Sequence, residues 1–119
     1  MDDLVQWLGE QYDEDERTAK AVQWDGSGNR LSWDLPASAT VDVGEDEFYA
    51  GDRTIANHIV RHDPARVLRE IDAKRQLIAK AAQLQAQVGD DPFAGVEDLL
   101  RLLALPYADR PGYREEWRP

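Results

Sequence analysis

The sequence predicts a boundary between two helices in the stretch His58-Ile59-Val60-Arg61-His62-Asp63-Pro64-Ala65-Arg66. The residue before a proline is pushed away from helical backbone angles, so we expect the first helix to end at His62. Asp63 can accept hydrogen bonds from the free N–H groups of the next helix, and Pro64 suits its first position. The stretch therefore predicts a short helix that ends here and a long one from Pro64 to about Val88.

Apolar side chains at three- and four-residue spacing predict the other helices. An N-terminal helix should carry one stripe of such side chains, capped by Asp2 or Asp3, and Asp52 or Thr54 should cap the short helix. A fourth helix should start at Asp91-Pro92 and end at Pro106. The N-terminal stripe consists of Leu4, Trp7, Leu8 and Tyr12. In the long helix we expect Val67, Ile71, Ile78 and Ala82 to face inward, with Leu68, Leu77 and Leu84 widening the stripe.

Alternating apolar and polar residues between the first two helices predict a small sheet. The turn cluster at 25–29 separates Trp24 from the alternating Leu31, Trp33 and Leu35, a pattern typical of a β-hairpin. Pro36 should end the second strand, and further short strands are expected around 41–43 and 48–50. The fold class is therefore α+β in a single domain, residues 1–119: an N-terminal helix, a small antiparallel sheet of three to four strands, three helices and an aromatic tail.

The tail beyond Pro106 has no helical or strand period, but it contains Tyr107, Tyr113 and Trp117. Large rings of this kind gain free energy when they leave water. We expect them to fold back against the helix around 99–105, or else to form a subunit contact.

Charge is abundant and unevenly distributed along the 119 residues, and the formal net charge is −10. Residues 1–52 carry a net charge of −11, residues 53–88 carry +4, and residues 89–119 carry −3. Proteins that contact phosphates need concentrated positive charge, so we expect no direct binding to nucleic acid. An acidic surface of this kind has another possible use, as a decoy that mimics DNA and occupies a nucleic-acid-binding protein.

The densest acidic run is Asp13-Glu14-Asp15-Glu16, on the expected N-terminal helix. Such a run is usually a solvated helix face. Its sharper interpretation is a docking patch for a basic partner. The candidate interaction residues are therefore these four acidic residues together with Tyr113 and Trp117.

Candidates for a metal site are His58, His62 and Asp63, because two histidines one helical turn apart can bind the same divalent ion. No glutamate lies between the histidines, so the metalloprotease motif is not met. The serines lack the Gly-x-Ser-x-Gly setting of a hydrolase nucleophile. We expect no metal, no cofactor and no catalytic site, and we keep a small metal-dependent hydrolase centred on His58 and His62 as an alternative.

Cysteine is absent, which excludes disulfides and thiolate-bound metals and fits a reducing cytoplasm. Met1 leads straight into Asp2-Asp3, without the basic and apolar regions of a signal peptide, so we expect none. No apolar run approaches the ~18 residues that a membrane-spanning helix needs. We therefore expect a cytoplasmic protein that does not cross a membrane.

Three parts of the sequence resemble a known family. They are the segment from Ala56 to Arg75, the segment from Leu100 to Pro119, and the opening Met1-Asp2-Asp3-Leu4-Val5 followed by the acidic run. Together they resemble a family from actinobacteria and their phages that is classed as domain of unknown function 6221. The resemblance implies an actinobacterial or phage source and brings no activity with it. We expect a small protein-interaction module that binds a host protein or forms a homo-oligomer.

Overall fold

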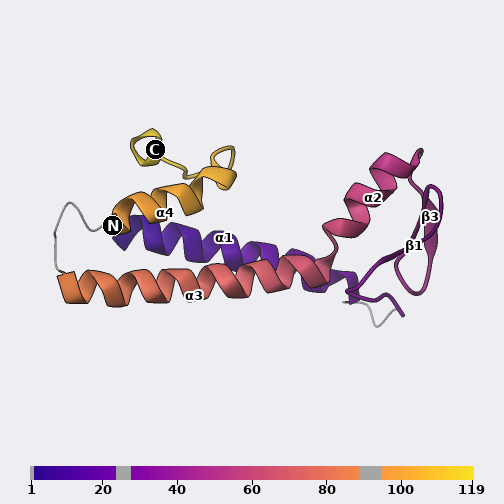
Figure 1. The fold of residues 1–119 in the computed structure, drawn as a ribbon, viewed down its shortest axis with the longest axis horizontal. Helices are drawn as coiled ribbons and strands as arrows, with labels where there is room; N and C mark the ends of the chain where they lie inside the picture. Colours follow the sequence, from indigo (N-terminus) through magenta and orange to yellow (C-terminus); the bar gives the residue numbers. More distant parts are fainter. Residues whose placement is uncertain (1, 24–27, 89–94) are drawn as a thin grey trace. The chain divides into compact units, whose positions relative to one another are not determined.

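The structure is a computed structural model that describes residues 2–23, 28–88 and 95–119 (Figure 1). Its contacts divide the chain into two compact units. The helical unit comprises residues 1–13 and 72–119, and the sheet unit comprises residues 14–71. Helices α1 (Asp2–Lys20) and α3 (Pro64–Val88) each contribute residues to both units. The α+β class is confirmed, whereas a single domain over residues 1–119 stays a prediction.

The helical unit is built on the first part of α1 and the second part of α3, which run side by side (Figure 1). An ion pair of 2.9 Å between Arg75 and Asp13 joins the two helices. Helix α4 (Val96–Ala104) continues into the 3₁₀ turn η2 (Leu105–Tyr107), and a second such turn, η3 (Glu115–Trp117), lies near the end of the tail. The expected stripe of α1 is confirmed, because Leu4, Trp7, Leu8 and Tyr12 are all buried.

Helix α3 has the bounds that its terminal residues predict, Pro64 to Val88, but its exposed surface differs from the expectation. Ala81 is buried and Ala82 is exposed, and Leu77 and Leu84 remain 43% and 45% exposed. Leu77 directly precedes Ile78, and so points about 100° away from it around the helix axis. The two leucines therefore lie at the edge of the buried stripe rather than within it.

The sheet unit contains the antiparallel strands β1 (Asp34–Ala37), β2 (Thr40–Asp42) and β3 (Glu47–Tyr49), in the order β1-β2-β3. The expectation that Pro36 ends a strand was wrong. Pro36 lies inside β1, which is an edge strand, and an edge strand tolerates a residue that has no N–H to donate. Val41 of the central strand is fully buried, and it pairs with Phe48 of β3.

The structure contradicts part of the prediction of a hairpin around residues 25–29. Residues 24–27 lie outside the part of the chain that the structure describes, and Leu31 and Trp33 are not in a strand. The backbone N–H of Trp33 donates to Asp63, and the carbonyl oxygen of Leu31 accepts from Ala65. These backbone groups bind the start of α3, so they do not pair with a second strand.

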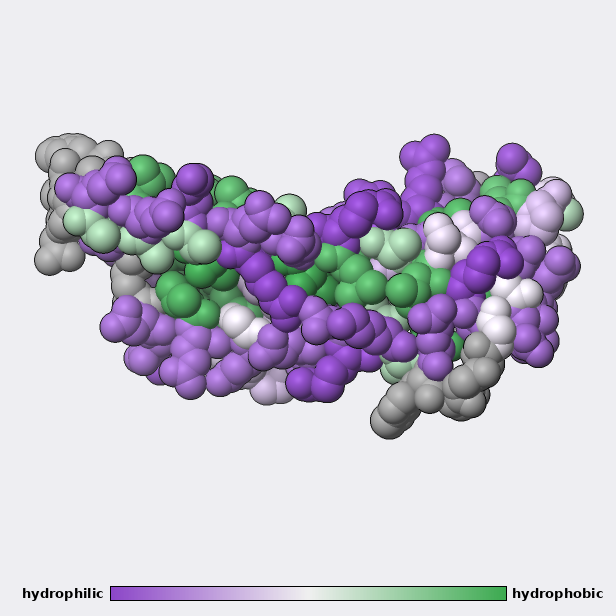
Figure 2. Space-filling view, turned by 90° about the horizontal axis from the view of Figure 1, so that it is seen from below, coloured by the Kyte–Doolittle hydropathy of each residue, from purple (hydrophilic) through white to green (hydrophobic). Residues whose placement is uncertain are grey.

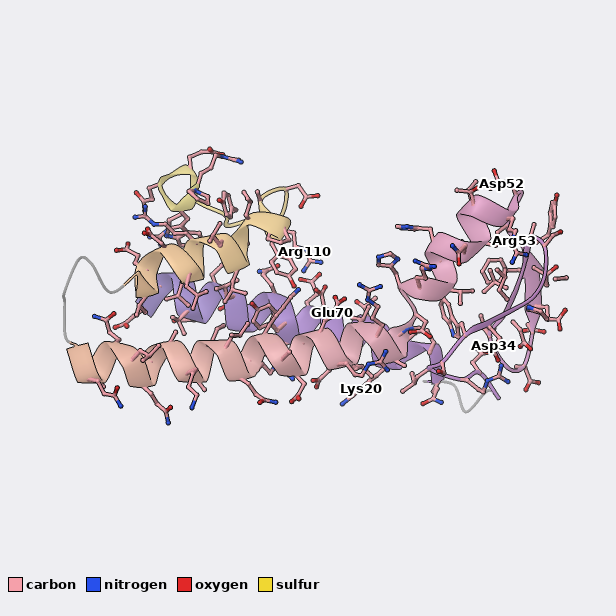
Figure 3. The ribbon with its side chains drawn as sticks, viewed as in Figure 1. Lys20, Asp34, Asp52, Arg53, Glu70 and Arg110 are labelled. Atoms are coloured by element: carbon pink, nitrogen blue, oxygen red, sulfur yellow. The ribbon has the colours of Figure 1, made fainter. Side chains whose placement is uncertain are left out.

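Helix α2 (Arg53–Arg61) follows the sheet and contacts β1 and β2 (Figure 1). The Asp52 carboxylate caps its start by accepting from Ile55 N at 2.8 Å, and Asp52 is labelled in Figure 3. The helix ends before His62, as the following Asp63-Pro64 predicts.

Helix α4 starts at Val96, after Gly95, within the described residues. The expected start at Asp91-Pro92 lies outside those residues. The helix ends at Ala104, two residues before Pro106, and that proline sits in the 3₁₀ turn.

Candidate functional site

Four aromatic rings gather around α1 in the helical unit. The centroid of the Trp7 ring lies 6.5 Å from that of Tyr107, 5.8 Å from that of Tyr113 and 5.5 Å from that of Trp117. Trp7 Nε1 donates to the carbonyl oxygen of Pro111 at 3.1 Å. The tail rings fold back onto the chain, as predicted, but the prediction named the helix around 99–105 as their partner, and the ring contacts in the structure are with Trp7 of α1.

Gly112 makes this approach of the tail possible. Its φ is +89°, in the left-handed region that favours glycine. A Cβ atom built there would lie 2.6 Å from Trp7 Nε1. Only a residue without a side chain lets the backbone pass this close to the indole ring.

A hollow of about 300 Å³ opens at the edge of this aromatic cluster. We call it the Trp7 hollow, and its lining combines two indole rings with charged and polar groups from α1 and the tail. Arg114 Nη1 lies 3.3 Å from an Asp3 oxygen and 3.6 Å from a Glu116 oxygen. The lining residues are Asp3, Gln6, Trp7, Glu10, Gly112, Arg114 and Trp117.

A second aromatic group lies deeper in the same unit. Lys74 Nζ donates to the Tyr107 hydroxyl at 3.2 Å and lies 5.9 Å from the centroid of the Tyr12 ring. Burial raises the pKa of Tyr12, because a phenolate would lose its hydration there, and Tyr107 adds to the effect. Arg110, labelled in Figure 3, donates to Gln11 and lies 4.6 Å from the Tyr107 ring centroid.

The acidic run Asp13-Glu14-Asp15-Glu16 lies on α1, where successive residues point about 100° apart. Four consecutive side chains therefore cover most of the way around the helix and do not form one face. Asp13 pairs with Arg75, and Glu16 pairs with Lys20 at 3.4 Å. The role of this run as a docking patch stays a prediction.

The two histidines lie against each other at the C-terminal end of α2, His58 within the helix and His62 as its C-cap. The rings of His58 and His62 lie 4.2 Å apart between centroids, and His62 Nδ1 is 2.7 Å from the carbonyl oxygen of His58. That oxygen can only accept, so the geometry assigns a proton to Nδ1 of His62. Both Asp63 oxygens accept from backbone N–H groups. No three histidine, aspartate or glutamate residues of the described ranges come close enough together to hold a metal ion.

A second hollow, of about 340 Å³, lies in the sheet unit. It brings together two residues that the sequence singled out separately, Asp15 of the acidic run and His62 of the histidine pair. The rest of its lining is mainly apolar, and the Thr18 hydroxyl donates to the carbonyl oxygen of Glu14 at 3.0 Å. The other lining residues are Thr18, Ala19, Val22, Trp33, Pro64 and Val67.

The sequence predicts Trp7 as part of the core stripe and does not reveal that this residue also lines the Trp7 hollow. Two of its polar lining residues on α1, Asp3 and Glu10, lie four residues before and three residues after Trp7. Their spacing was a usable signal, because residues three and four apart lie on the same side of a helix. Their tail partners, in contrast, lie about a hundred residues away along the chain.

Comparison with known proteins gives a family and no activity. No curated protein and no solved structure matches the chain. No helix of the described residues is both long and apolar enough to cross a membrane. A family model covers residues 1–119, which includes the segments that the resemblance left out. The whole chain therefore belongs to a family of unknown function, DUF6221.

Proposed function

We propose that this protein is a small acidic interaction module that binds another protein, either a host protein or a second copy of itself. The observation that carries the proposal is an exposed face of α3 with almost no charge. Residues 76–87 contain one charged side chain, Lys80, whereas 32% of all residues in the chain are charged. We call the exposed side chains of residues 76–87 the α3 face.

The apolar part of the α3 face consists of leucine side chains that lie along the helix. Leu77 and Leu84 are about half exposed, and the buried Ala81 lies between them. The two leucines are seven residues apart, which is the repeat of the seam along which two helices pack in a coiled coil. On the side of the molecule drawn in Figure 2, the helical unit shows hydrophobic residues bordered by hydrophilic ones.

The low charge of the α3 face favours a second copy as its partner. Two chains with a net charge of −10 repel each other, and this repulsion is weakest where few like charges approach. Each leucine keeps somewhat less than half of its surface in water, so its burial would contribute ~1 kcal/mol. Four leucines in two copies support a weak, concentration-dependent complex.

Sedimentation velocity over a series of protein concentrations tests this function. The wild-type protein should associate as its concentration rises, and the double variant Leu77→Gln, Leu84→Gln should remain a monomer. Leu102→Gln is the matched control, because Leu102 of α4 is 56% exposed and lies outside the α3 face. A wild-type monomer at all concentrations, or the same loss in the control, would contradict self-association through α3.

The runner-up function is a decoy that mimics DNA, and the net charge of −10 supports it. A decoy competes with DNA for its target, so adding duplex DNA should release the partner. An interaction module bound through the α3 face should keep its partner under the same conditions. Once a host partner has been identified, this competition experiment distinguishes a decoy that mimics DNA from an interaction module.

The hydrolase alternative rests on His58 and His62 alone, since both oxygens of Asp63 already accept from the backbone. Zinc sites usually have three or four protein ligands.

The proposal keeps the cytoplasmic location that the sequence led us to expect. It also keeps the actinobacterial or phage source, which the resemblance of residues 56–75 and 100–119 supports.

A further inference from the structure

We propose that the Trp7 hollow binds the side chain of an arginine from a basic protein partner. This inference rests on the proposed function, because it names the chemistry of a host partner. It concerns a different surface from the α3 face, through which a second copy is proposed to bind.

Two indole rings form the apolar part of the hollow. Trp7 and Trp117 line it, and their ring centroids lie 5.5 Å apart. Both residues are largely buried, so the structure holds the rings in place before any ligand arrives. Indole faces attract cations, and a guanidinium group also stacks flat on an aromatic ring. The parts of the two rings that line the hollow therefore suit a cationic side chain such as arginine better than an acidic one.

Charge at the rim points to the same class of ligand. Two carboxylates, those of Asp3 and Glu10, line the hollow together with the guanidinium of Arg114. Arg114 lies 3.3 Å from Asp3, while Glu10 accepts only a 3.4 Å bond from Gln6 within the described part of the chain. Glu10 thus leaves a negative charge without a cation beside an aromatic wall, where an arginine can pair with it.

The chain itself shows that this surface accommodates a guanidinium. The guanidinium carbon of Arg114 lies 5.2 Å from the centroid of the Trp117 ring, and the same group pairs with Asp3. A partner arginine at Glu10 would repeat this combination of ring and carboxylate. The aromatic wall on that side is Trp7, which lies one helical turn before Glu10 on α1.

A peptide titration followed by NMR tests the inference. The indole N–H signals of Trp7 and Trp117 are recorded while a capped Gly-Arg-Gly peptide is added. The matched peptide carries citrulline, which has nearly the shape of arginine but no charge. We expect both indole signals to shift with the arginine peptide and to stay in place with the citrulline peptide. No shift with arginine, or equal shifts with citrulline, would overturn the inference.

Two charge variants separate the hollow from the overall acidity of the protein. Glu10→Gln should weaken binding of the arginine peptide ~5-fold, the upper range for a solvent-exposed ion pair. Asp98→Asn removes one negative charge from an exposed residue of α4 and should leave binding unchanged. Equal weakening by the two variants would show that net charge alone attracts the peptide, and would refute the site.

The two proposals can fail separately. Sedimentation of the Glu10→Gln variant reports on the α3 face, and it should match the wild-type protein. A hollow that ignores arginine in a protein that still self-associates would overturn this inference and leave the proposed function standing. Far-ultraviolet circular dichroism of both variants confirms that a loss of binding is not a loss of fold.

Discussion

The carboxylate of Asp63 binds the backbone of Trp33 and the first turn of α3 at the same time. Its Oδ2 accepts from Trp33 N at 2.9 Å, and its Oδ1 accepts from Arg66 N, also at 2.9 Å. Asp63 is only 8% exposed, and both bonds are partly buried. One side chain thereby caps a helix and fixes the segment that leads into β1.

Because Asp63 makes both hydrogen bonds, even a conservative substitution at this position should lower the stability of the protein. Asp63→Ala removes both bonds and should lower the free energy of unfolding by ~2–3 kcal/mol, more than a helix cap alone. Asp63→Asn should lower the free energy of unfolding by about half as much. Its amide offers one acceptor oxygen to one backbone N–H and turns an NH₂ group toward the other. Urea titration of the three proteins measures the difference. If asparagine were as stable as aspartate, Asp63 would act as a cap only.

The Asp63-Pro64 boundary was predictable because caps and prolines act within one helical turn. The bond from Trp33 was not, since it joins residues 30 positions apart and depends on how the chain returns. Pro36 misled the prediction for a related reason. Whether a strand tolerates proline depends on which strands flank it, and the sequence does not show that β1 lies at an edge.

The candidate site was predictable only in part. The aromatic residues of the tail indicated that it packs, because large rings are rarely left in water. Their partner Trp7 could not be identified, since Pro111 lies 104 positions further along the chain. Helical spacing likewise predicts Leu77 as part of the core stripe, because it places an edge residue close to the buried ones, and the structure leaves this side chain 43% exposed.

The tight passage of the tail past Trp7 predicts a cost for any side chain at Gly112. Gly112→Ala must keep a positive φ and also displace the Trp7 ring, so it should lower the free energy of unfolding by ~2 kcal/mol or more. Gly51→Ala is the control, because Gly51 has φ +95° and no atom within 4 Å of the added carbon. It should cost ~1 kcal/mol. Equal losses in thermal or urea unfolding would mean that the tail does not approach Trp7 this closely.

The surroundings of the buried Tyr12 hydroxyl predict that its removal does not lower the stability of the protein. Within the described residues, no partner lies at hydrogen-bond distance from this hydroxyl. Tyr12→Phe should therefore leave stability unchanged or raise it by ~1 kcal/mol. Tyr107→Phe, which loses the bond from Lys74, should instead be destabilising. A clear loss of stability in Tyr12→Phe would reveal a partner for the hydroxyl.

The raised pKa of Tyr12 predicts how stability changes in alkali. In the unfolded chain the phenol ionises near its usual pKa of 10.0, and in the folded protein it ionises only at higher pH. The unfolded state therefore loses its proton first, and stability should fall as the pH rises above about 10. Tyr12→Phe should reduce this fall. Identical unfolding profiles of the two proteins between pH 9 and 11 would contradict the burial of Tyr12.

The charge distribution predicts no direct binding to duplex DNA at ~0.15 M salt. The part of the chain best suited to attract phosphates is a group of four basic residues on α3. Two of them are already paired, Arg66 with Glu70 at 2.7 Å and Arg75 with Asp13. A gel-shift assay should show no complex. A complex that disappears when Arg66, Arg69, Lys74 and Arg75 are replaced by glutamine would refute this prediction.

Pairing of two copies through the α3 face is tested most directly by an interspin distance. The chain contains no cysteine, so Gln83→Cys places a single spin label on α3, about 100° around the helix from Leu84 and therefore beside the leucines that are proposed to pair. Axes of packed helices lie 8–10 Å apart, so labels on two paired copies should be separated by roughly 20–40 Å. Double electron–electron resonance should detect this distance, and Leu77→Gln with Leu84→Gln should abolish it. The absence of this distance at concentrations where the protein sediments as a dimer would contradict an interface on α3.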